Sequence, residues 1–146
     1  MATQSAIATL IEIAEKDTDE AAKKLGKAIR YHEETIAKLN LLAQYRDDYD
    51  MKFRDNAARG ISASQYANFT SFLDKLDSAV EGQKLVVAEA ARRIEIAKNN
   101  WQGCEKKRLS YNTLDQRTKI GQQLKETKRD QKQTDDFAAR AYFYKS

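Results

Sequence analysis

The 146-residue chain is too polar for a compact globule of its length, with 33% charged residues and a mean hydropathy of −0.78. Such polarity suits a helical hairpin, in which each helix buries only one stripe of residues. A single cysteine excludes an internal disulfide and any cysteine-based zinc site.

The first residues have no positively charged leader, and Glu12 interrupts the short apolar run that follows. We therefore predict no signal peptide. No apolar run in the sequence reaches the length needed to cross a bilayer. We expect a cytoplasmic protein without direct membrane insertion.

A first helix is predicted from about Thr3 to about Asp55. Its first half carries mostly apolar or small residues at strict heptad spacing: Ile7, Ile11, Ala14, Thr18, Ala21, Leu25, Ala28 and His32. The stripe is expected to continue through Ile36, Leu39, Ala43 and Arg46. A second stripe begins beside it, at Leu42, Tyr45, Tyr49 and Phe53. The apolar surface near the end of this helix is therefore wider than a two-stranded seam requires.

A short turn is predicted at about residues 56–61. Asn56 is expected to end the first helix, and Gly60 supplies backbone freedom. Two helices joined by so few residues must fold back on each other in antiparallel orientation. We therefore predict an all-α fold, a single coiled-coil hairpin over residues 1–146.

The second helix is predicted from about residue 62 to about residue 142. Ser62 and Gln65 have the spacing of a capping box, and Ile61 and Tyr66 have the spacing of a hydrophobic staple. Both motifs indicate that the helix begins here.

A seam with a 3.5-residue period follows in this helix. Its members are Phe69, Leu73, Leu76, Val80, Gln83, Val87, Ala90, Ile94, Ala97, Trp101, Cys104, Arg108 and Tyr111. Only Gln83 and Arg108 break the apolar pattern, and no proline occurs in the chain to force a kink. A period sustained this long indicates a helix supercoiled against a partner.

The two stripes match when residues whose numbers sum to about 118 or 119 are paired, which places Tyr49 beside Phe69 and Ile7 beside Tyr111. In this register everything after about Asn112 has no partner within the chain and forms an overhang. An intermittent apolar face runs along it, made of Leu114, Ile120, Leu124, Phe137, Ala138, Ala141 and Tyr142. The overhang is either frayed or awaits a partner.

Charge favours neither a polybasic tail nor a nucleic-acid binder. Residues 104–146 carry 11 Lys+Arg against 6 Asp+Glu, with acidic residues interleaved among the basic ones. Arg140 and Lys145 lie near aromatic residues, but no groove-reading motif accompanies them.

The sequence shows no motif that would bring metal-binding or catalytic side chains together. His32 is the only histidine, and Glu33 and Glu34 beside it point to other faces of the helix, so we predict no metal site. Cys104 lies on the seam, where a free cysteine packs as a small apolar residue. There is no phosphate-binding loop and no nucleophile elbow, and we expect a helical hairpin to lack a concave pocket. We predict that the protein is not an enzyme and takes no cofactor.

The wide apolar surface near the turn allows two interpretations. Its residues are either all core at a thickened hairpin tip or a docking face next to the seam. In the second case the seam uses Leu39, Ala43, Phe69, Leu73 and Val80, and the offset stripe is left exposed. We call that stripe the turn-proximal face; its members are Leu42, Tyr45, Tyr49, Phe72, Leu76 and Ala79.

Three segments resemble the FliJ family, small coiled-coil components of the bacterial flagellar type III export apparatus. They are Ala6–Gly26, the turn segment Arg59–Leu76 and the closing segment Arg129–Ala141. The closing RDQKQTDDFAARA is the most specific, because heptads alone match many unrelated coiled coils. The resemblance covers the chain essentially end to end. It implies an antiparallel two-helix coiled coil similar to the central stalk, the γ subunit, of rotary ATPases.

The resemblance also implies a function. Family members bind and stimulate the hexameric export ATPase, with the end that carries both termini entering the ring. They bind the cytoplasmic linker region of the export-gate membrane protein FlhA and assist the exchange of export chaperones. The protein would then be peripherally associated with the flagellar base at the inner membrane. A self-associating structural coiled coil and a nucleic-acid-binding rod are the alternatives.

Two sets of contact residues follow from the resemblance. The export-gate contact is the turn-proximal face, and two further positions of it hold Lys38 and Gln83, where the family has a glutamine and a histidine. The export-ATPase contact is formed by Ile7, Leu10, Ile11, Arg129, Asp130, Gln131, Asp135, Phe137 and Arg140.

Overall fold

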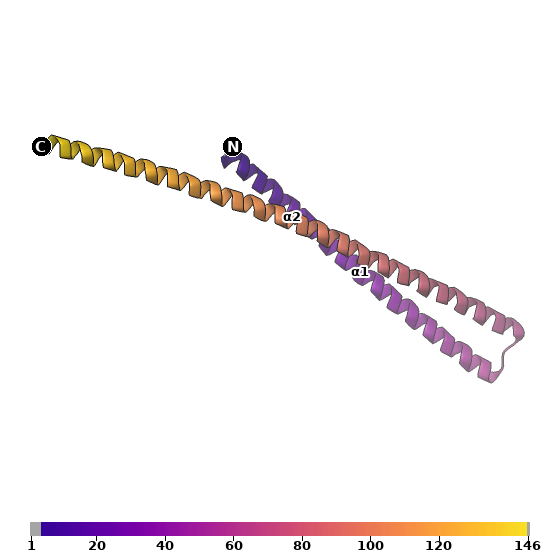
Figure 1. The fold of residues 1–146 in the computed structure, drawn as a ribbon. Coiled ribbons are helices and arrows are strands. Elements are labelled where there is room, and N and C mark those ends of the chain that lie inside the picture. The colour runs from indigo at the N-terminus through magenta and orange to yellow at the C-terminus, as the bar shows by residue number, and fades with distance from the viewer. Residues whose placement is uncertain (1–3, 146) are drawn as a thin grey trace. The chain divides into compact units, whose positions relative to one another are not determined.

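The computed structural model describes residues 4–145 and contains two long helices joined by a tight turn (Figure 1). Helix α1 spans Gln4–Arg59 and helix α2 spans Ala63–Lys145. Residues 4–145 contain no strand, so the predicted all-α hairpin is confirmed. Thr3, the predicted start of the first helix, lies outside the described residues.

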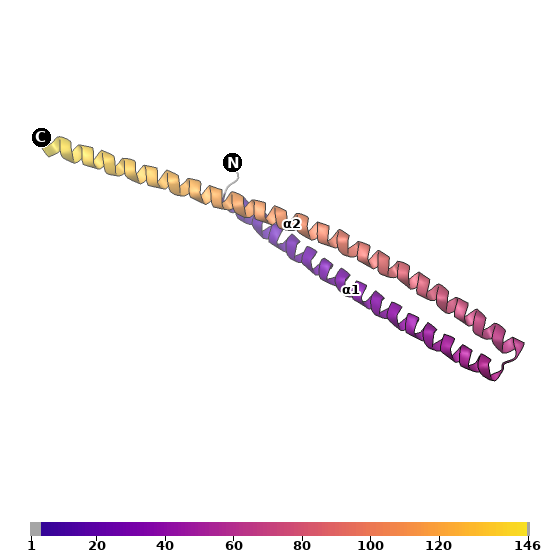
Figure 2. The ribbon, with the colours of Figure 1, turned by 60° about the horizontal axis from the view of Figure 1, so that its bottom comes forward.

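The chain is divided into two compact units, each of which contains parts of both helices. The first unit consists of Met1–Asp19 and Gln102–Ser146, and the second consists of Glu20–Trp101. The turn lies in the second unit, where both views of the ribbon show α1 and α2 side by side (Figures 1 and 2). Each unit buries its own part of the heptad seam.

The first helix ends at Arg59, so the predicted end at Asn56 is wrong. Asn56 lies inside α1 at a half-buried seam position. The helix ends instead where Gly60 adopts a φ of 91°, a conformation that favours glycine because it has no Cβ. The Gly60 amide donates to the Ala57 carbonyl at 3.2 Å and closes the last turn.

The capping box at the start of α2 is confirmed by both of its hydrogen bonds. The backbone N–H of Gln65 donates to Ser62 Oγ at 3.1 Å, and the backbone N–H of Ser62 donates to the side-chain Oε1 of Gln65 at 3.1 Å. Two backbone donors that a helix start leaves unpaired are thereby satisfied. The predicted staple between Ile61 and Tyr66 stays a prediction; Ile61 is half-buried and Tyr66 is exposed.

The seam predicted on α2 is confirmed throughout the second unit. Every seam position from Phe69 to Trp101 is buried or half-buried. Ala90 is completely buried, and Leu76 keeps 7% of its surface exposed. Apolar surface removed from water stabilises the pair by about 25 cal/mol per Å².

On α1 the seam departs from the predicted stripe at Thr35, which is buried with 3% of its surface exposed. After His32 the seam keeps heptad spacing through Thr35, Leu39, Leu42, Arg46, Tyr49, Phe53 and Asn56. The predicted stripe is half-buried at Ile36, Leu39, Ala43 and Arg46, as is Leu42, but the prediction missed Thr35, which is the buried position here. A polar residue fits here because Thr35 Oγ1 donates to the His32 carbonyl at 2.7 Å, within its own helix.

The predicted register is confirmed at two points of the second unit. The ring centroids of Tyr49 and Phe69 lie 5.3 Å apart. Gln83 Nε2 donates to the Thr35 carbonyl at 3.0 Å. In both pairs the residue numbers sum to 118, as the matching of the stripes requires.

In the first unit, α1 contributes Ile7, Ala14 and Thr18 as buried residues. On α2, half-buried positions recur at seam spacing as far as Thr118, and Gly121 is half-buried one residue before the next seam position. The fully exposed stretch therefore begins at Gln122 rather than near Asn112, and every residue from 122 to 144 is exposed. This stretch is helical throughout.

Candidate interaction surfaces

Six aromatic side chains gather near the turn, three from each helix: Tyr45, Tyr49, Phe53, Tyr66, Phe69 and Phe72. Tyr49 lies at the centre, with its ring 5.3 Å from Phe69 and 4.6 Å from Phe72. Tyr45 meets Phe72 edge-on at 6.4 Å. Such pairs contribute beyond their buried area, so this end of the hairpin is held by ring contacts as well as by the seam.

The turn-proximal face is only partly exposed, so neither of its two interpretations describes all of it. Leu76 is buried, and the expectation that it lies on an exposed stripe is wrong. Leu42, Tyr49 and Phe72 are half-buried, Tyr45 is 51% exposed, and Ala79 is exposed. A partner of this face would meet the outer edge of the aromatic cluster, where Tyr45 is the most accessible ring among the six predicted contact residues. The gate-contact role of these six residues stays a prediction.

Two further positions of this face behave differently from each other. Lys38 is exposed. Gln83 is half-buried and uses its amide to bond the Thr35 carbonyl across the seam. Gln83 therefore already has a structural role within the hairpin.

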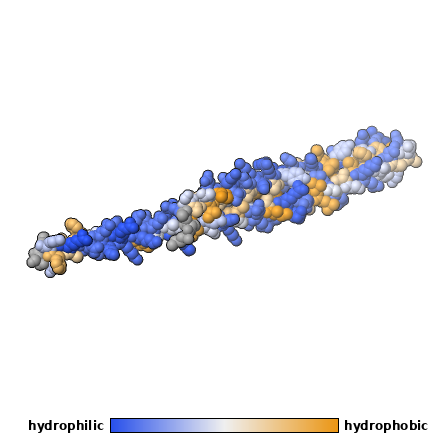
Figure 3. Space-filling model, turned by 90° about the horizontal axis from the view of Figure 1, so that it is seen from above, coloured by the Kyte–Doolittle hydropathy of each residue, from blue (hydrophilic) through white to orange (hydrophobic). Residues whose placement is uncertain are grey.

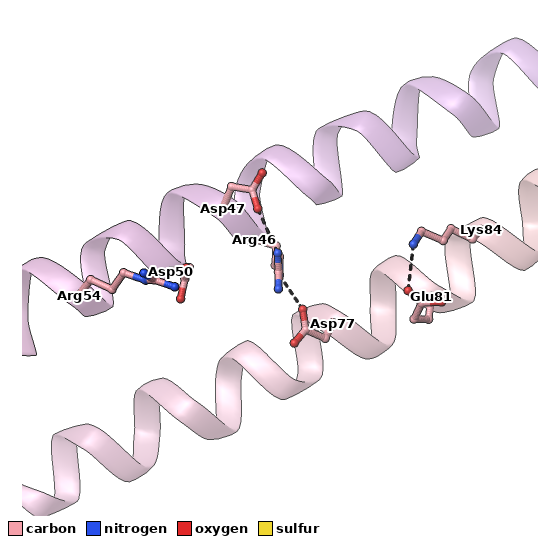
Figure 4. A network of polar contacts seen from close by, with 7 residues as sticks. All are labelled: Arg46, Asp47, Asp50, Arg54, Asp77, Glu81 and Lys84. Atoms are coloured by element: carbon pink, nitrogen blue, oxygen red, sulfur yellow. Dashed lines mark hydrogen bonds and ion pairs between the residues drawn. The ribbon is translucent and has the colours of Figure 1, made fainter.

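A hollow of about 610 Å³ that is open to solvent lies between α1 and α2 in the second unit. Its lining combines apolar residues with charged ones: Leu39, Asn40, Ala43, Arg46, Asp47, Asp77, Val80, Glu81 and Lys84. Figure 4 shows Arg46 of α1 between Asp47 and Asp77, and Lys84 beside Glu81 on α2. Arg46 Nε bonds Asp77 Oδ1 at 2.6 Å, and Lys84 Nζ bonds Glu81 Oε1 at 3.0 Å.

Arg46 links the two helices at this hollow. Its hydrogen bond to Asp77 raises the pKa of the guanidinium, and a second bond to Asp47 acts in the same direction. Arginine does not titrate near neutral pH, so Arg46 is not a proton-transfer group. Its role in this structure is to link the two helices through Asp77. Sequence reasoning missed this contact, because the register places Phe72 and Leu73 opposite Arg46 and only the long arginine side chain reaches Asp77.

The first unit holds the residues predicted to contact the export ATPase. Ile7 is buried with 2% exposed, Ile11 is half-buried, and Leu10 is 37% exposed. The six predicted residues on α2 are all exposed: Arg129, Asp130, Gln131, Asp135, Phe137 and Arg140. The α1 members thus pack mostly within the hairpin, while the α2 members face solvent. Their roles stay predictions.

Arg108 occupies the seam of the first unit, where it is surrounded by carboxylates. Its Nε donates to Glu105 Oε2 at 3.1 Å. This bond raises the pKa of Arg108 and lowers that of Glu105, and the charges of Glu15 and Asp19 on α1 also raise the arginine pKa. The cation that interrupts the apolar seam is therefore neutralised locally.

Neither His32 nor Cys104 belongs to a metal-binding cluster; both are half-buried, and residues 4–145 contain no suitable group of three His, Cys, Asp or Glu side chains. The part of the chain that the structure describes has no helix long and apolar enough to span a bilayer.

An antiparallel helical hairpin, with an aromatic cluster near the turn and an exposed end to its second helix, defines an all-α coiled-coil protein. The sequence matches the family model described as "Flagellar FliJ protein" over residues 3–146. It is 29% identical to the Flagellar FliJ protein of Salmonella typhi and 29% identical to that of Escherichia coli K12, in each case over 97% of this chain and 96% of the relative. The chain therefore belongs to the FliJ family.

Proposed function

We propose that the protein is a non-enzymatic coupling component of the flagellar type III export apparatus. Membership of the FliJ family makes it a component of that apparatus, and its relatives are named as flagellar proteins rather than as enzymes. In this proposal it binds the hexameric export ATPase, favours the assembled hexamer and raises its turnover. It is cytoplasmic and associates peripherally with the flagellar base at the inner membrane.

The observation that supports the ATPase contact most directly is the state of residues 122–144. These residues are helical and entirely exposed. A helix of this length gains little from its own backbone, and most helical stability in proteins comes from packing. Such a stretch gains stability when a partner surrounds it, as the central hole of a ring would.

Contact with the export gate is the second part of the proposal. Tyr45 exposes half of its surface beside Phe72, and Ala79 is exposed on the same face. Aromatic side chains are enriched at the core of protein interfaces. We assign this face to the cytoplasmic linker region of FlhA. Assistance in the exchange of export chaperones completes the proposal and rests on the family alone.

The ATPase role is tested by adding purified protein to the purified export ATPase across a concentration series. We expect turnover to rise with added protein and the hexamer to become more abundant by analytical ultracentrifugation. An unchanged turnover at every concentration would refute the coupling role.

Self-association is a second candidate, because large apolar side chains such as Leu124, Phe137 and Tyr142 are exposed by 58%, 75% and 80%. Two copies would then pair through these exposed stretches. Sedimentation at micromolar concentration distinguishes the candidates: a monomer contradicts this one, and a concentration-dependent dimer supports it.

A further inference from the structure

The seam of α2 changes chemistry beyond the part that α1 covers. Continuing its alternating spacing past Tyr111 leads to Asp115, Thr118, Gln122, Lys125, Arg129, Lys132 and Asp136. Where upstream positions hold apolar residues, three successive positions here hold cations. We call Lys125, Arg129 and Lys132 the cationic seam.

Elsewhere in the molecule, cations at seam positions are matched by carboxylates. Arg46 bonds Asp77 of the opposite helix at 2.6 Å. Arg108 bonds Glu105, and the charges of Glu15 and Asp19 on the opposite helix add to its stabilisation. A cation on this face is therefore met by acidic groups wherever the face is covered.

The cationic seam has no such match among residues 4–144. None of its three side chains forms an ion pair or a hydrogen bond there, and all three are exposed. At 100° per residue they fall within a sector of about 60° on the helix. Glu126 and Asp130 point about 90° or more away from the centre of that sector, whereas Asp136, the next seam position, lies within it.

The surface around the cationic seam is polar. Gln122, Lys125, Glu126 and Arg129 lie together on this surface, and all four are exposed. On the face visible in Figure 3, hydrophilic residues cover most of this end of α2, and apolar residues return only close to the C-terminus. An apolar partner would leave these charges buried without counterions, at a high desolvation cost.

We propose that the cationic seam docks onto an acidic protein surface that presents carboxylates at the spacing of a helix seam. This rests on the proposed function, in which the exposed stretch enters the export ATPase ring, and it identifies the ring's contact as a row of Asp and Glu side chains. A second copy of this chain aligned in register does not fit, because Lys125, Arg129 and Lys132 would then face the same cations. Nucleic acid fits less well, because Asp136 occupies the next seam position and the cationic run is short.

The test compares two variants of the full chain that lose the same charge. In the seam variant, Lys125, Arg129 and Lys132 are each replaced by Gln. In the matched control, Lys23, Lys75 and Lys106, which are exposed at outward positions of the paired helices, are replaced by Gln. Binding to the purified export ATPase is measured from about 50 to 200 mM salt, a range over which screening of exposed charges increases. Circular dichroism reports helicity.

The seam variant should bind the ATPase about tenfold more weakly at low salt, and its affinity should depend less on salt than that of the wild type. The control should bind like the wild type. Equal binding by all three proteins overturns the inference and leaves the proposed function standing, whereas no binding by the wild type overturns both. Equal weakening of both variants shows a net-charge effect and also overturns the inference. A duplex DNA probe is titrated in parallel, and a loss confined to DNA binding reassigns the surface to nucleic acid.

Discussion

At the scale of single residues, the hairpin tolerates the buried or half-buried polar groups of Thr18, Thr35 and Gln83 in its seam because each of these three is hydrogen-bonded. Thr18 Oγ1 donates to the Ala14 carbonyl at 2.8 Å, and Thr35 Oγ1 donates to the His32 carbonyl. Gln83 reaches across to the Thr35 carbonyl. A shifted register would leave the Gln83 amide without this acceptor, so one polar contact between the helices favours a single alignment.

The pair of Tyr45 and Phe72 tests the gate contact at this scale. Replacing both residues by Ala should weaken binding to the cytoplasmic linker region of FlhA by about tenfold or more, because aromatic anchors dominate interface energies. Tyr45 is 51% exposed, so its loss costs little packing within the hairpin. Binding is measured by calorimetry, and circular dichroism should stay helical.

The matched control replaces Phe53 and Tyr66 by Ala in the same way. The rings of these two residues lie 5.5 Å apart in the same cluster but outside the turn-proximal face. This variant should keep its affinity for the gate. If the Tyr45 and Phe72 variant loses its helicity instead, both residues are structural core and the assignment fails.

At the scale of secondary-structure elements, the helix ends follow from local chemistry, whereas the interior of α2 contains a glycine that lowers helix stability. Gly60 ends α1 with a φ of 91°, and the Ser62–Gln65 capping box begins α2. Gly82 lies inside α2, and a Cβ added there would meet no atom within 4 Å. We find no structural need for this glycine.

The same substitution should therefore have opposite effects at these two glycines. Gly82→Ala should raise the free energy of unfolding by about 1 kcal/mol, because alanine loses less backbone entropy in a helix. Gly60→Ala should lower it by about 1 kcal/mol or more, because a Cβ disfavours positive φ. Urea denaturation of both variants measures the two changes. A destabilising Gly82→Ala would show that the Gly82 position has a packing role.

At the scale of the whole molecule, periodicity predicted most of the fold. The α2 seam is buried or half-buried at each position from Phe69 to Tyr111, and the pairing of Tyr49 with Phe69 followed from matching two stripes. Errors arose where polar residues occupy apolar positions. Thr35 was missed because its hydroxyl is satisfied within the helix, and Asn56 was taken as a helix end although it lies on the seam.

The interaction sites were less predictable for a physical reason. Tyr45 is exposed and Leu76 is buried because the two residues meet different sides of the opposite helix. The apolar spacing along one helix does not show which side of the other helix a residue will meet. The match between Arg46 and Asp77 likewise requires the register. Partner contacts depend in addition on the chemistry of a second surface. Sequence patterns therefore predicted the hairpin well, but the exposure of individual residues near the turn only in part.

The division of the molecule into a folded hairpin and an exposed stretch leads to a prediction for a shortened chain. A variant that ends at Gly121 lacks only residues beyond the half-buried seam. Its denaturation midpoint should stay close to that of the full chain, because exposed residues contribute little to stability. Its stimulation of the export ATPase should be lost, and its binding to the FlhA linker region should be kept.

The Tyr45 and Phe72 variant should show the reverse pattern, with ATPase stimulation kept and gate binding lost. Measuring both activities on both variants separates the two ends of the molecule. A shortened chain that still stimulates the ATPase would place the ATPase contact upstream of Gln122, on the paired part of the hairpin. A steep fall in its denaturation midpoint would show instead that residues 122–146 stabilise the hairpin, contrary to the exposure of residues 122–144.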